Sequence, residues 1–105
     1  MVKYMIVQNM DYAKEGHTRN REDFSLVFDT EITQDMIKSI NLGKIESVFT
    51  DSAGKVVIVS TSVGDTTASI SFFNTLKSDR AALIDKFISE MQKSTKKTFE
   101  LVDNL

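Results

Sequence analysis

The chain has no cysteine, no proline, no tryptophan and a single histidine among its 105 residues. Without cysteine there can be no disulfide framework and no thiolate zinc site. The one histidine, His17, excludes sites that need two or more imidazoles. The composition therefore predicts no metal site and no cofactor, and it leaves little scope for enzyme catalysis at neutral pH.

The chain also has little excess of one sign of charge and few long apolar runs. The formal net charge is −2, although 41% of the residues are hydrophobic, which is enough for a globular core. A chain so close to neutral has no general attraction for nucleic acid or an anionic membrane. Residues 1–10 are too short for a membrane span and lack a signal-peptide pattern. We expect one cytoplasmic domain over residues 1–105, with no nucleic-acid partner and no membrane partner.

Two strands are predicted in the first thirty residues. Val2–Val7 is rich in β-branched and aromatic residues. The second strand, Phe24–Phe28, carries an apolar side chain at every other position and is expected to pair antiparallel with the first. Between them Asn9–Asp23 shows neither the helix period nor the strand period. It is predicted to be the longest irregular segment, with one helical turn at Asp11–Glu15 as the alternative.

The segment Lys44–Phe73 predicts three consecutive strands separated by two turns. Asp51–Gly54 and Val63–Thr66 have turn composition, which explains Asp51 and Asp65 better than a catalytic role does. Val56–Val59 is a run of four β-branched residues and predicts a central strand. The third strand shows a half-buried alternation, with one face formed by Ala68, Ile70 and Phe72.

Two helices complete the predicted fold. A short one begins at the N-cap Thr33 and ends at Gly43, and a longer one spans Asp79–Lys93. Thr98–Val102 is expected to add a short edge strand. The order β-β-α-β-β-β-α predicts an α+β, two-layer fold: a mostly antiparallel sheet of about five strands packed with two helices. The longer helix places five apolar residues on one face, namely Leu83, Ile84, Phe87, Ile88 and Met91.

In the order of its elements, Lys44–Lys93 resembles the roadblock and longin modules, which are dimerisation and docking platforms for small GTPases. The first thirty residues depart from the roadblock pattern because they lack its leading helix. What the resemblance implies is a role in protein interaction, although a shared fold does not establish function.

The candidate binding residues are His17, Arg19 and Arg21 in the predicted irregular segment. Cations of these types can gather around a phosphate or a carboxylate. The alternative is a solvated surface of mixed charge, because acidic residues share the segment. His17 with Asp11 is the sole candidate pair for acid–base catalysis, and we expect no enzyme activity.

Two functions follow as expectations. The favoured one is a non-catalytic module for protein interaction or self-association, whose partner is another protein or a second copy of the chain. The alternative is a small-anion or nucleotide-phosphate binding protein that uses residues 9–23.

Overall fold

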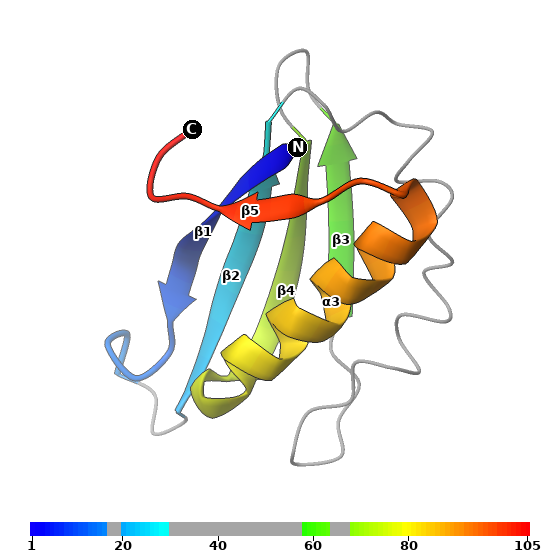
Figure 1. The fold of residues 1–105 in the computed structure, drawn as a ribbon. Helices are drawn as coiled ribbons and strands as arrows, with labels where there is room; N and C mark the ends of the chain where they lie inside the picture. The colour runs from blue at the N-terminus through cyan, green and yellow to red at the C-terminus, as the bar shows by residue number, and fades with distance from the viewer. Residues whose placement is uncertain (17–19, 30–57, 64–67) are drawn as a thin grey trace.

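The computed structural model describes residues 1–16, 20–29, 58–63 and 68–105 (Figure 1). One layer is a five-stranded sheet and the other is a helix that crosses one face of it diagonally. The fold is therefore α+β with two layers. The helix predicted at Thr33–Gly43 and the strand predicted before Asp51 lie outside the described residues. In chain order the described elements are β1 Val2–Asp11, β2 Arg21–Phe28, β3 Ile58–Val63, β4 Ala68–Leu76, the 3₁₀ turn η1 Lys77–Asp79, α3 Arg80–Thr95 and β5 Phe99–Leu101.

The strand order is β3-β4-β2-β1-β5. Neighbours from β3 to β1 are antiparallel, as predicted for β1 with β2. β5 instead runs parallel to β1, because α3 carries the chain from the end of β4 back along the sheet before β5 begins. Val56–Val59 was predicted to be a central strand. Its described part, Ile58 and Val59, begins β3, and β3 is the last strand at one side of the described sheet rather than a central one.

The core lies between the sheet and α3. Phe24, Leu26 and Phe28 point from β2 toward the helix, and all three are fully buried. Phe24 stacks on Phe72 of β4 with ring centroids 4.9 Å apart, and Phe72 meets Phe87 of α3 edge to face at 5.8 Å. The predicted stripe on the longer helix is confirmed, since its five apolar residues are all buried. Within the described segments, no helix combines the length and the apolar character needed to cross a bilayer.

The prediction that Asn9–Asp23 is irregular is wrong at both ends. Asn9 to Asp11 continue β1, and Arg21 to Asp23 begin β2. These parts of the strands lack alternating apolar residues, and polar side chains that bind one another across the strands stabilise them instead. Gln8 Nε2, for example, donates to Glu22 Oε1 at 2.9 Å. The alternative of one helical turn at Asp11–Glu15 agrees with the structure there, because the Glu15 N–H donates to the Asp11 carbonyl at 3.2 Å.

Candidate functional site

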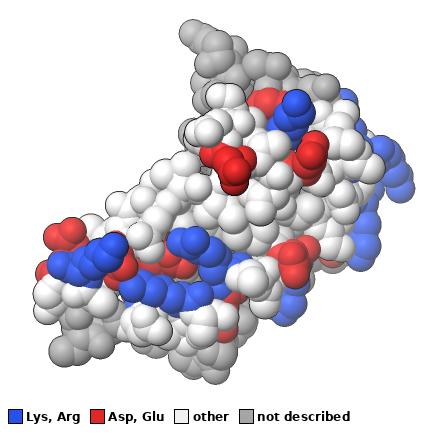
Figure 2. Space-filling view, turned by 60° about the vertical axis from the view of Figure 1, so that its left-hand side comes forward, with Lys and Arg blue, Asp and Glu red and all other residues white. Residues whose placement is uncertain are grey.

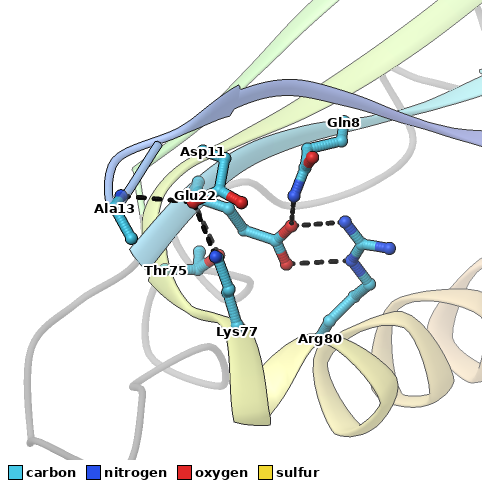
Figure 3. A network of polar contacts seen from close by, with 7 residues as sticks. All are labelled: Gln8, Asp11, Ala13, Glu22, Thr75, Lys77 and Arg80. Carbon is cyan, nitrogen blue, oxygen red and sulfur yellow. Dashed lines mark hydrogen bonds and ion pairs between the residues drawn. The ribbon is translucent and has the colours of Figure 1, made fainter. Parts of the chain in front are cut away.

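A buried carboxylate fastens the sheet to the start of α3 (Figure 3). Glu22 of β2 lies on the helix-facing side, and its side chain is 1% exposed. Arg80, the first residue of α3, donates from Nε to Oε2 at 2.9 Å and from Nη2 to Oε1. Gln8 donates to the same Oε1. These donors compensate for the loss of water around the carboxylate, which would otherwise make its burial costly.

Arg80 also rests on the core. Its guanidinium carbon lies 5.4 Å from the centroid of the Phe24 ring, within the range of a cation–π contact. The planar guanidinium thus satisfies a carboxylate at its edge and an aromatic ring at its face. One side chain therefore fixes where α3 begins relative to β2.

A second ion pair lies beside the first. Lys77 Nζ of η1 is 2.6 Å from Asp11 Oδ1 of β1, and the same oxygen accepts the Ala13 N–H at 3.2 Å. The hydrogen bond from Lys77 is the main reason that the pKa of Asp11 lies below its ordinary value of 3.8, and burial opposes it only in part. This pair holds the beginning of the β1–β2 connection against η1.

Two β-bulges flank Asp23 at the same end of the sheet. The β1–β2 register shifts between Gln8 and Met10, and the β2–β4 register shifts opposite Asn74. Asn74 has a φ of 54°, in the left-handed region, and its N–H donates to Asp23 Oδ1 at 2.8 Å. The Tyr12 hydroxyl donates to the same oxygen at 2.9 Å. Asp23 therefore links the bulge in β4 to Tyr12, the first residue after β1.

We call Gln8, Asp11, Glu22, Asp23, Lys77 and Arg80 the polar cluster. Four of its charges form two ion pairs, Asp11 with Lys77 and Glu22 with Arg80, and Figure 2 shows lysine and arginine side chains directly beside acidic ones at one end of the face in view. In the part of the chain that the structure describes, no three His, Asp or Glu side chains come together as metal ligands would. The contacts of the polar cluster fasten the elements to one another.

The structure describes one of the three predicted anion-binding residues. His17 and Arg19 lie outside the described residues. Arg21 is the first residue of β2, is 6% exposed, and donates from Nη1 to the Asn74 carbonyl. Anion binding by the three residues stays a prediction.

Glu22 and Arg80 were missed because 58 positions separate them, so no local spacing joins them. A signal was nonetheless present. The alternation of Phe24, Leu26 and Phe28, extended back by one step, places Glu22 on the core side, where a charge needs a partner.

The other feature of note is the short outer strand β5, at the opposite end of β1 from the polar cluster. We call Phe99–Leu101 the β5 edge. Leu101 pairs in register with Tyr4 of β1, so both lie on the helix-facing side of the sheet. Tyr4 is buried, and this burial, with the charge of Asp85, raises the pKa of its hydroxyl, which stays protonated at neutral pH. Leu101 is 55% exposed.

The backbone of β5 forms hydrogen bonds with β1 along one side of the strand only. Val2 N–H donates to the Thr98 carbonyl and Val102 N–H to the Tyr4 carbonyl, both at 2.9 Å. In a parallel pair alternate residues face the neighbour, so the backbone groups of Phe99 and Leu101 face away from β1. The Phe99 N–H is bound by Gln92 Oε1 of α3 at 3.1 Å. The Leu101 N–H has no such cap among the described residues.

Comparison with known proteins finds no family model, no curated protein and no solved structure that matches the chain. The interpretation of both sites therefore rests on their geometry.

Proposed function

We propose that the chain is a non-catalytic module that acts by contacting another protein chain, and that the β5 edge is its contact surface. The observation that carries the proposal is Leu101, a large apolar side chain left 55% exposed on an edge strand. Unpaired backbone groups on such a strand accept an added strand, and an apolar side chain beside them adds buried area. The edge therefore offers both parts of a strand-addition site.

The polar cluster supports the same proposal. Glu22 with Arg80, and Asp11 with Lys77, are each bound to a partner that holds a secondary-structure element in place. Groups committed in this way serve the fold, whereas an acid or base must be able to exchange its proton with a substrate.

The test compares protein binding by the wild type and two matched variants. L101K places a charge on the edge strand, whereas L105K makes the same change at an equally exposed leucine outside β5. We expect the wild type and L105K to bind the same protein, either a second copy or a different chain, and L101K to lose it. The proposal would be overturned if the wild type bound no protein, or if L101K still bound every protein that the wild type binds.

A further inference from the structure

We infer that the occupant of the β5 edge is a second copy of this chain, added antiparallel so that Leu101 pairs with Leu101 of the partner subunit. The inference rests on the proposed function and names its partner. Three features of the edge favour a symmetric contact: the backbone groups of Leu101, which face away from β1 and have no partner among the described residues, the apolar side chains of Tyr4 and Leu101, and the order of charges along the segment.

The backbone selects the register. An antiparallel pair of directly opposed residues can exchange two hydrogen bonds, N–H to carbonyl in both directions. With Leu101 opposite itself across a two-fold axis, the central pair needs only the N–H and carbonyl of Leu101. Pairing Phe99 with Leu101 would need the Phe99 N–H, which Gln92 already holds. Among pairings of these two outward-facing residues of the β5 edge, only Leu101 opposite Leu101 leaves the bond between the Phe99 N–H and Gln92 out of the central pair.

The side chains of this register continue the core. Tyr4 and Leu101 are neighbours on the helix-facing side, and Tyr4 is buried. A symmetric pair would extend this row from Tyr4 through both Leu101 side chains to Tyr4 of the partner subunit. Leu101 would then lose most of its contact with water, which is the favourable term in such an association.

Charge favours the antiparallel direction. Lys96 and Lys97 precede β5 and Asp103 follows it. Antiparallel addition brings the basic end of one segment toward the acidic end of the other, whereas parallel addition places like charges together. The segment is therefore complementary to itself in the direction that a two-fold axis requires.

Sedimentation equilibrium over about 10 µM to about 1 mM tests the association, because so small an edge gives a weak dimer. We expect the average mass of the wild type and L105K to rise from 11.8 kDa toward twice that value. L101K should weaken the association by about tenfold or more. Heteronuclear spectra establish that both variants are folded. A wild type that remains monomeric, or an L101K variant that dimerises equally well, would overturn the inference.

Single cysteines test the register, since the natural chain has none. Under mild oxidation L101C should form a disulfide-linked dimer several-fold faster than L105C, and V102C should lag because its side chain points to the other face. Equal rates of disulfide formation in the three variants would overturn the inference.

The outcomes also separate the inference from the proposed function. If the protein stays monomeric yet binds a different protein through Leu101, a second copy is excluded as the occupant and the proposed function stands. If it binds neither a second copy nor a different protein, the inference and the proposed function both fail.

Discussion

The carboxylate of Glu22 occupies a core-facing position of β2 where the strand pattern calls for an apolar side chain. Three donors from Gln8 and Arg80 make that position tolerable for a charge. Arg80 itself is 32% exposed, so water screens the pair on one side. At the scale of single residues, the pair therefore sits between a surface ion pair and a fully buried one, and its contribution should be intermediate.

Replacing Glu22 with glutamine keeps the shape of the side chain and removes its charge. E22Q should lower the free energy of unfolding by about 1–3 kcal/mol, the range for losing a charged hydrogen bond at a partly screened site. Urea denaturation followed by circular dichroism measures this. The control E90Q breaks the exposed pair of Glu90 with Lys93 and should cost under about 0.5 kcal/mol. Equal losses in the two variants would contradict the role given to Glu22.

The Asp11–Lys77 pair predicts a pH effect. The pKa of Asp11 is lower in the folded chain than its ordinary 3.8, so its contribution to stability is present above 3.8 and is lost as the pH falls through the folded pKa. Carboxyl ¹³C shifts followed through an acid titration should show this low pKa in the wild type. K77Q should raise it toward 3.8, whereas the control K14Q, at an exposed turn residue, should leave it low. An unchanged pKa in K77Q would show that another group causes the shift.

At the scale of the elements, alternation was enough to predict which faces are buried. The apolar residues of β2, β4 and α3 lie on the faces that their periods indicate. The ends of the strands were not predictable in the same way. β1 and β2 extend into polar sequence because Gln8, Tyr12 and Asp23 form side-chain hydrogen bonds across the strands. Such bonds join residues that local periodicity cannot connect.

The bulge in β4 depends on one left-handed residue. Asn74 has a φ of 54°, and its side-chain Oδ1 is buried with no hydrogen-bond partner among the described residues. N74G should be as stable as the wild type or more so, because glycine tolerates this conformation and removes the buried oxygen. N74A should be less stable than N74G by about 1 kcal/mol, since alanine keeps the left-handed strain. Thermal unfolding of both variants measures the difference, and an N74A variant as stable as N74G would argue against the bulge.

At the scale of the whole molecule, the two-layer α+β class and a short edge strand near the end of the chain could be predicted, whereas the neighbour and the direction of β5 could not. Short connections predict antiparallel neighbours, but α3 is a long connection and returns the chain parallel to β1. The polar cluster escaped prediction for a related reason: it joins β1, β2 and the start of α3, which come together only once the sheet has formed. Long-range topology thus decides both the edge and the cluster.

This topology predicts an uneven distribution of stability. β2 is paired on both sides and covered by α3, so the amide of Leu26 should exchange with solvent only when the whole domain unfolds. β5 is three residues long and is paired with β1 on one side, so Glu100 should exchange through local opening. In dilute protein, we expect the Glu100 amide to exchange at least about a hundredfold faster than the Leu26 amide, as measured by hydrogen–deuterium exchange NMR. At concentrations where the β5 edge is paired with a second copy, exchange at Leu101 should slow while exchange at Leu26 stays constant. Equal protection of Glu100 and Leu26 in dilute protein would contradict the uneven distribution of stability, because β5 would then open only when the whole domain unfolds.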